Sequence, residues 1–220
     1  MDISHYSPEA FNSLPSLFAA RTGLELHRET VRRLGEVIGR HHLQDVVGVA
    51  LLHRHFEIGR DERIVERIDR GRSESVARAE TQGEGAVPHL FRFSAEGWRP
   101  IEFLGAEDAA GNAIAETLER VAATPAFLRE FANVLVQDGA VDVFGVGLFH
   151  GREQLVSETD GILVERTDVA GRASVVRAES TRAVAGLDVT ETLWLWDGKT
   201  PRLTCVCTGK GDDHAHIDKQ

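Results

Sequence analysis

One stretch decides the fold: Val46-Val47-Gly48-Val49-Ala50-Leu51-Leu52-His53-Arg54-His55-Phe56. It is rich in β-branched and aliphatic residues and lies between Asp45 and Gly59, which predicts a buried strand. A second strand is expected over residues 64–68, across the turn at 59–62. The stretch therefore indicates β structure with two histidines at the end of a central strand.

An altered copy of this stretch follows in the second half of the chain, as Val143-Phe144-Gly145-Val146-Gly147-Leu148-Phe149-His150. A shift of 97 residues places His53 on His150. A shift of 99 residues, after a small insertion in the turn, places Glu66-Arg67 on Glu165-Arg166. Agreement between two separate blocks predicts an internal duplication.

The elements around the stretch are read from periodicity and turn signals. Apolar residues at helical spacing predict a helix over about 24–40. Further strands are expected at 75–80, 90–93 and 98–104, the last at a sheet edge because it contains Pro100. In the second copy a helix is expected over 113–122, and another begins at Pro125 behind the cap Thr124.

These elements predict an α+β fold built by tandem duplication of a helix plus a sheet of about five antiparallel strands. The break at 105–112 divides the chain into a first unit, residues 1–104, and a second unit, residues 105–220. Two copies are too few for a solenoid, so a pseudo-two-fold pair is expected. A cleft between the copies would then be the default ligand site.

Composition limits the classes of function. A net charge of −10 argues against sequence-independent nucleic-acid binding, which needs a surplus of cations. No apolar run approaches the roughly 18 residues that span a bilayer. The first residues, 1–5, lack the basic start of a signal peptide. We therefore expect a cytoplasmic protein with no nucleic-acid or membrane partner, and the sequence leaves its oligomeric state open.

His53 and His55 are the first candidate metal ligands. Two residues apart on a strand, their side chains leave on one face and can offer two imidazoles to one ion. The alternative is that the strand emerges from the core here and both histidines lie at its solvated end. His55 has no counterpart in the second copy, where Arg152 takes its place.

A second candidate set lies at the end of the chain, as Cys205-x-Cys207 followed by His214-x-His216. Two thiolates and two imidazoles form a tetrahedral zinc set, and copper(I) also suits such soft ligands. The alternative is a pair of core-facing cysteines beside an unrelated polar tail. The spacing of the two cysteines excludes a long-range disulfide framework.

The two sets can also combine into one site, with His53, His55 or His150 joining or replacing a tail histidine. Three protein ligands and an open position would make a catalytic site, whereas four ligands would make a structural one. The sequence thus predicts a transition-metal protein, with zinc favoured, and a metal-dependent small-molecule enzyme as one form of it. The alternatives are a non-catalytic protein that binds a small ligand or partner between the copies, and a purely structural module.

Repeated charges on adjacent strands carry a further expectation. Glu66-Arg67 and Arg78-x-Glu80, with their counterparts Glu165-Arg166 and Arg177-x-Glu179, predict cross-strand ion pairs on a solvated sheet face. If they lined the cleft instead, the arginines would suit a small anionic ligand. The three tryptophans are expected to be packing anchors. No phosphate-binding glycine loop or nucleophile elbow is found in the sequence.

Overall fold

The computed structural model describes residues 6–110, 114–151, 155, 161–197, 200–210 and 213–214. The first half of the chain contributes the strands β1 (Val47–Leu51), β2 (Glu62–Asp69), β3 (Glu74–Thr81), β4 (Val87–Ser94) and β5 (Gly97–Leu104). The second half contributes β6 (Phe144–Leu148), β7 (Gly161–Asp168), β8 (Ala173–Ser180), β9 (Val189–Asp197), β10 (Thr200–Lys210) and β11 (Asp213–His214).

Ten of these strands close into one mixed β-barrel in the order β10-β7-β8-β3-β2-β5-β4-β6-β1-β9, with β9 pairing back to β10. β1 runs antiparallel to β6 with Val49 opposite Val146, and β3 runs antiparallel to β8 with Val76 opposite Val175. The β2–β5 and β7–β10 pairs are parallel. Closure leaves no exposed sheet edge in the ring, which removes a site of aggregation.

The expected α+β fold of two helix-plus-five-strand repeats was wrong, because strands of both halves form one barrel. The sequence pattern located the strands, but it contained no information on their partners. Two separate sheets would each have left unpaired strand edges. In the barrel these edges pair with strands from the other half, through β1–β6, β3–β8, β4–β6 and β1–β9.

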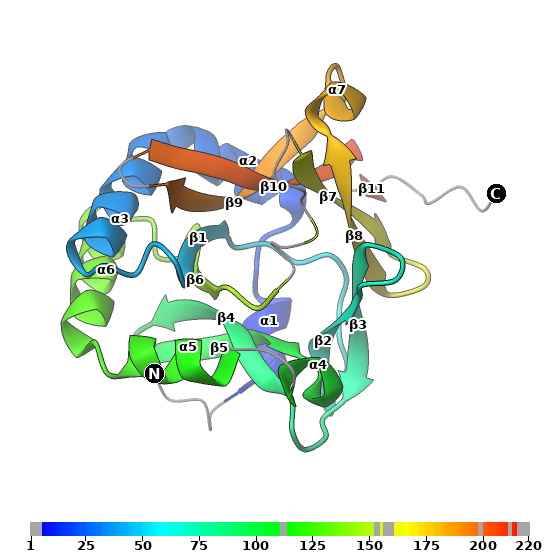
Figure 1. Ribbon diagram of the computed structural model, residues 1–220, viewed down its shortest axis with the longest axis horizontal. Coiled ribbons are helices and arrows are strands. Elements are labelled where there is room, and N and C mark those ends of the chain that lie inside the picture. The colour runs from blue at the N-terminus through cyan, green and yellow to red at the C-terminus, as the bar shows by residue number, and fades with distance from the viewer. Residues whose placement is uncertain are drawn as a thin grey trace.

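The helices are α1 (Pro8–Asn12), α2 (Leu17–Leu26), α3 (Arg28–Arg40), α4 (Ala106–Ala110), α5 (Ile114–Ala122), α6 (Pro125–Gln137) and α7 (Thr181–Val184). The helix expected over 24–40 is thus two helices that break at His27. The helices α2, α3, α5 and α6 gather on one side of the strands, at the left of Figure 1. No helix in the described part of the chain is long and apolar enough to cross a membrane.

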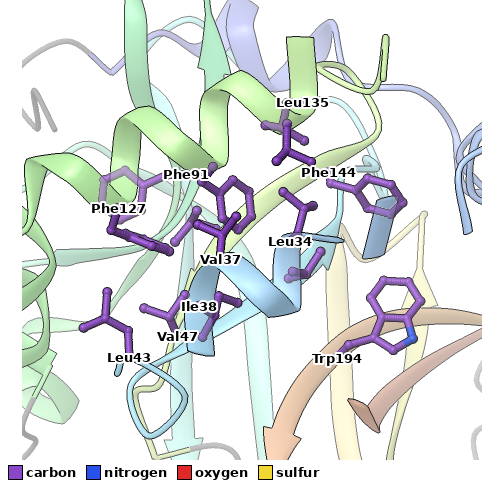
Figure 2. Packing of buried hydrophobic residues seen from close by; sticks show 14 of the residues in the cluster. Leu34, Val37, Ile38, Leu43, Val47, Phe91, Phe127, Leu135, Phe144 and Trp194 are labelled. Carbon is purple, nitrogen blue, oxygen red and sulfur yellow. The ribbon is translucent and has the colours of Figure 1, made fainter. Parts of the chain in front are cut away.

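The main hydrophobic core lies between the helices α2, α3, α5 and α6 and the outer face of the barrel. Figure 2 shows Leu34, Val37 and Ile38 of α3 grouped with Phe127 and Leu135 of α6. All five side chains are fully buried. Burying a side chain of this size contributes about 1.5–3 kcal/mol relative to leaving it exposed, so this layer is a major source of stability.

Alternation along β1 separates this outer core from the barrel interior. Val47, Val49 and Leu51 belong to the core beneath the helices. Ala50 instead packs in a second cluster with Leu163 of β7 and with residues of β9 and β10. Since neighbouring residues of a strand point to opposite faces, Ala50 faces the interior. The inward positions of several strands therefore meet inside the barrel.

The tryptophans are packing anchors, as expected. Trp98, Trp194 and Trp196 are buried in the main core. The Trp98 ring meets Phe131 edge to face, with centroids 5.8 Å apart. Trp196 lies so close to α3 that a Cβ atom on Gly35 would be 2.0 Å from its ring. A glycine is therefore required where this helix approaches β9.

The edge position expected for the strand with Pro100 was wrong, because β5 lies between β2 and β4. Pro100 pairs opposite Phe91 of β4. On its other side β5 pairs with β2 only over Glu102–Leu104. The missing N–H of the proline therefore falls outside the β2–β5 ladder, and an interior strand tolerates it.

Candidate metal centre

His53 and His55 follow the end of β1 rather than lying on it, since the strand ends at Leu51. Both side chains are buried, with 7% and 9% of the residue surface exposed, and their ring centroids are 4.5 Å apart. The extension of the strand to Phe56 was therefore wrong, and so was the alternative of a solvated strand end. Because the chain leaves the strand after Leu51, the two imidazoles point away from the helix-facing core and line a cavity in the barrel.

Residues 52–58 are held in place by the N-terminal segment. The Asn12 side chain donates to the Ile58 carbonyl at 2.9 Å and accepts from the Ile58 N–H at 3.0 Å. The Arg54 N–H donates to the Pro15 carbonyl at 2.9 Å. Contacts to the backbone on both sides of His55 fix the position of both imidazoles.

The first group of potential ligands is the Glu165 cluster, which comprises His53, His55, Glu165 and Cys207. Glu165 lies on β7 and Cys207 lies opposite it on the parallel neighbour β10. Each residue offers one ligand atom, and these atoms all lie within 4.8 Å of one another. All four residues are buried. Three distant segments of the chain therefore bring four metal-ligating groups to one point.

Hydrogen bonds orient both imidazoles of this cluster. His53 Nδ1 lies 2.9 Å from the carbonyl oxygen of Leu51, which can only accept, so Nδ1 donates. A neutral His53 ring then presents the lone pair of Nε2. His55 Nδ1 lies 2.9 Å from Thr167 Oγ1, and its Nε2 lies 3.1 Å from Glu165 Oε1. Metal-bound histidines are usually held by such contacts through the second ring nitrogen.

The carboxylate and the thiol are also held in place. Ser174 Oγ donates to Glu165 Oε1 at 2.7 Å inside the barrel. Burial raises the pKa of the Cys207 thiol well above its ordinary value, and the charges of Glu165 and Cys205 raise it further. The thiol is therefore neutral at pH 7 without a metal. A bound cation would displace its proton, because a coordinating thiol is deprotonated.

The second group is the Glu66 cluster, which comprises Glu66, His89 and His150. Glu66 Oε2 lies 2.9 Å from His150 Nε2 and 3.4 Å from His89 Nε2. His150 Nδ1 lies 2.9 Å from the Leu148 carbonyl oxygen, and the His89 and His150 rings stack with centroids 4.1 Å apart. Glu66 is only 1% exposed. Both Nε2 atoms therefore lie within 3.4 Å of the same buried carboxylate oxygen.

A single cavity in the barrel connects the two clusters. Its walls include His53, His55 and Glu165 from one cluster and His89 and His150 from the other. Its volume is about 50 Å³, and about 10–15 Å³ is needed to hold one water molecule. The cavity therefore has room for a few solvent molecules beside a bound ion.

Thr192 adds a polar group to this cavity. Its residue is 5% exposed and lies in the cavity wall on β9. Thr192 Oγ1 is buried and has no hydrogen-bond partner within the described part of the chain. Since buried polar groups are normally paired, this hydroxyl marks the cavity as a place for solvent or a ligand.

The candidate ligands from the sequence are distributed over several places. His53, His55 and Cys207 meet in the Glu165 cluster, whereas His150 belongs to the Glu66 cluster. Cys205 is 1% exposed and lines the cavity without joining either cluster. His214 lies in β11, and its backbone pairs with Gly209 of β10. The side chain of His214 and the whole of His216 lie outside the described residues.

Sequence reasoning missed both glutamates by assigning them to a solvated face. The neighbouring arginines do form the expected outer ion pairs, Arg67 with Glu80 at 2.9 Å and Arg166 with Glu179. Glu66 and Glu165, however, are on the opposite, inward side of the same strands. The signal was the alternation that places each glutamate on the face of Ile64 or Leu163. No comparable signal marked His89.

Comparison of the chain with protein-family models, curated proteins and solved structures finds no match. The two clusters and the cavity between them are therefore the basis for any functional argument.

Proposed function

We propose that this protein binds one divalent transition-metal ion in the Glu165 cluster, with zinc as the ion that suits the ligands best. The observation that carries the proposal is the convergence of two imidazoles, a carboxylate and a thiol within 4.8 Å inside the barrel. Nitrogen, oxygen and sulfur ligands in a set of four are typical of zinc sites.

The spacing of the ligands suits a tetrahedral ion. Bonds of about 2.0–2.3 Å place tetrahedral ligands about 3.3–3.8 Å apart. His55 Nε2 and Glu165 Oε1 are 3.1 Å apart. An ion between these two atoms requires shifts of a few tenths of an ångström, and the other ligand atoms, all within 4.8 Å of one another, would move by up to about 1 Å. The hydrogen bonds to Leu51, Thr167 and Ser174 already orient the ligands that would make them.

The charges of the cluster also balance with a divalent ion. Glu165 and a deprotonated Cys207 supply two negative charges, and both histidines bind as neutral rings. Without a cation, a buried carboxylate carries a desolvation cost of several kcal/mol that an ion pair offsets only in part. A metal bound by four groups at once offsets this cost more completely than the contact with His55 and the hydrogen bond from Ser174.

Four protein ligands make a closed site, so the ion in the Glu165 cluster has a stabilising role. Its ligands come from the segment after β1, from β7 and from β10, and it therefore links distant parts of the barrel. The alternative of a protein that binds an organic ligand is less well supported. Pockets for such ligands have volumes of about 300–1,000 Å³, whereas the cavity at the clusters has about 50 Å³. The hollow of about 690 Å³ beside Arg67 and Arg78 is an open groove on the surface.

The proposal is tested with cobalt(II) as the probe, on protein purified without an affinity tag. Cobalt bound to Cys207 gives a thiolate-to-metal charge-transfer band in the near ultraviolet. We expect this band in the wild type, and its loss in Cys207→Ser. Cys205→Ser is the matched control, because Cys205 lies on the same strand and lines the same cavity but is outside the cluster. This control should retain the band.

Two further outcomes decide the proposal. A charge-transfer band that disappears equally in both serine variants would place the ion on the pair of cysteines and not in the Glu165 cluster. A wild-type protein that binds cobalt without any such band would exclude Cys207 as a ligand. The His55→Ala variant provides a second test that does not depend on the thiolate band. Its affinity for cobalt should fall at least tenfold.

A further inference from the structure

We infer that the Glu66 cluster is a second metal site, with three protein ligands and a fourth position that opens to the cavity and holds a solvent molecule or a small anion. This site shares no residue with the Glu165 cluster. It goes beyond the proposed function, and each site can be tested by itself.

The hydrogen-bond geometry of His150 is the first argument. Its Nδ1 lies 2.9 Å from the carbonyl oxygen of Leu148 and must donate to it. The neutral ring then has its lone pair on Nε2, which lies 2.9 Å from Glu66 Oε2. Two lone-pair-bearing atoms at this distance need a proton or a cation between them.

His89 is the second argument, because it adds another imidazole nitrogen to this contact. Its Nε2 lies 3.4 Å from the same oxygen, Glu66 Oε2, so two imidazoles converge on one carboxylate oxygen. The two rings stack with centroids 4.1 Å apart and an angle of 29°, an arrangement that disfavours two positive charges. A cation bound to both Nε2 atoms and to Glu66 satisfies all three groups with neutral imidazoles.

Two histidines and one carboxylate are a ligand set found in catalytic zinc sites and in non-heme iron sites. Three protein ligands leave a coordination position free. His89 and His150 both line the cavity, so that position is directed to a space of about 50 Å³. This volume holds about three or four water molecules, or a small anion such as azide.

The charge of the site favours an activated solvent molecule. Glu66 supplies one negative charge against two positive charges of the ion, which leaves a net charge of about +1 in a buried environment. A metal-bound water in such a site loses a proton readily, because the resulting hydroxide neutralises this charge. The Glu66 cluster is therefore the open site of the pair, and the Glu165 cluster is the closed one.

The experiment measures cobalt(II) binding to the wild type, Glu66→Gln, His89→Ala and His41→Ala. The wild type should bind two ions per chain, and azide should change the visible absorption of one of them. Glu66→Gln and His89→Ala should each bind one ion, retain the thiolate band and lose the response to azide. His41 lies outside both clusters, so His41→Ala should behave as the wild type does.

Each outcome bears on one site. The wild type could bind a single ion, with the same thiolate band and stoichiometry in Glu66→Gln and His89→Ala. This result would overturn the second site and leave the proposed function intact. Cobalt bound without a thiolate band, and lost in both variants, would support the Glu66 site and overturn the Glu165 site. Glu66→Gln preserves the size of the side chain. If His89→Ala alone fails to fold, Glu66→Gln still provides the test of this site.

Discussion

His53 and His150 make the same contact, each two residues beyond the end of a strand. Each Nδ1 atom lies 2.9 Å from the carbonyl oxygen two residues earlier, that of Leu51 or Leu148. The backbone at the end of β1 and of β6 therefore sets the orientation of each ring. Each Nε2 is left to face the cavity, where a glutamate belongs to the same cluster. In both clusters, one backbone hydrogen bond therefore sets which ring nitrogen of the histidine faces the cavity.

Ser174 should tune metal affinity through Glu165. Its hydroxyl donates to Glu165 Oε1 at 2.7 Å and orients the carboxylate. Partners of metal ligands typically contribute about 10–100-fold to affinity. Ser174→Ala should therefore weaken cobalt binding by about that factor, as measured by competition with a chelator.

Ser75 provides the matched control for this substitution. It is fully buried at the corresponding place on β3, and its Oγ has no hydrogen-bond partner in the described ranges. Ser75→Ala should leave cobalt affinity unchanged. Equal losses of affinity in both variants would mean that Ser174 acts through general stability and not through Glu165.

Cys207 gives the metal-free protein a specific dependence on pH. Because burial raises its pKa, the folded state retains the thiol proton more strongly than the unfolded state. The resulting stability is fully present below the unfolded pKa of about 8.5 and falls as the pH rises above it, by about 1.4 kcal/mol per pH unit. Tyr6, whose pKa burial also raises, acts only above about pH 10.

Urea unfolding of chelator-treated protein at several pH values between 7.5 and 10 measures this effect. The free energy of unfolding of the wild type should fall with pH across this range more steeply than that of Cys207→Ala. Parallel curves for the two proteins would show that Cys207 is not the group responsible.

At the scale of elements, α3 shows how closely a helix approaches the barrel. Replacing Gly35 by alanine would place Cβ 2.0 Å from the Trp196 ring. The helix gains about 1 kcal/mol from alanine, but overpacking a core costs about 1–3 kcal/mol. Gly35→Ala should therefore lower the free energy of unfolding.

Gly39 on the same helix is the control, because a Cβ there would meet nothing within 4 Å. Gly39→Ala should raise the free energy of unfolding by up to about 1 kcal/mol. Denaturant melts of both variants measure the difference. A stabilised Gly35→Ala protein would contradict the close packing of α3 against β9.

The sequence predicted the positions of the strands better than the pairing between them. Alternation and turn residues located β2 to β5 to within a few residues, because these signals are local. They did not show where β1 ends, since Leu52 and Phe56 continue the apolar pattern but pack against α1 instead. The partners of each strand depend on contacts across the whole chain, which a local pattern does not encode.

The candidate site was predicted in the same partial way. His53, His55 and Cys207 were recognised by residue type, because imidazoles and thiols are uncommon and ligate metals well. Glu66 and Glu165 were assigned to the surface, since a glutamate beside an arginine normally forms an outer ion pair. Only the closure of the barrel shows that these strands have a second, enclosed face.

At the scale of the whole molecule, closure of the barrel makes the two halves depend on each other. β1 and β3 pair with β6 and β8 of the second half. A fragment of residues 1–104 would expose these strand edges and the cavity wall. It should therefore show no cooperative thermal transition by circular dichroism. A fragment that melts cooperatively as a monomer would contradict the mutual dependence of the halves.

The barrel interior is unusual in holding two glutamates and four histidines in two clusters. Burial of so many ionisable groups is unfavourable unless they are paired or bind a cation. The proposed metal ion would account for this arrangement, because it would offset the cost of the buried charges and link the segment after β1 to β7 and β10. A protein stabilised in this way should lose thermal stability when a chelator removes the ion.

The most direct test is the metal content of the wild type purified without an affinity tag, measured by elemental analysis together with Cys207→Ser and Cys205→Ser. We predict at least one equivalent of a transition metal, chiefly zinc, in the wild type and in Cys205→Ser. The content of Cys207→Ser should be lower by close to one equivalent. Sub-stoichiometric metal in the wild type, with no uptake from added zinc, would contradict the account.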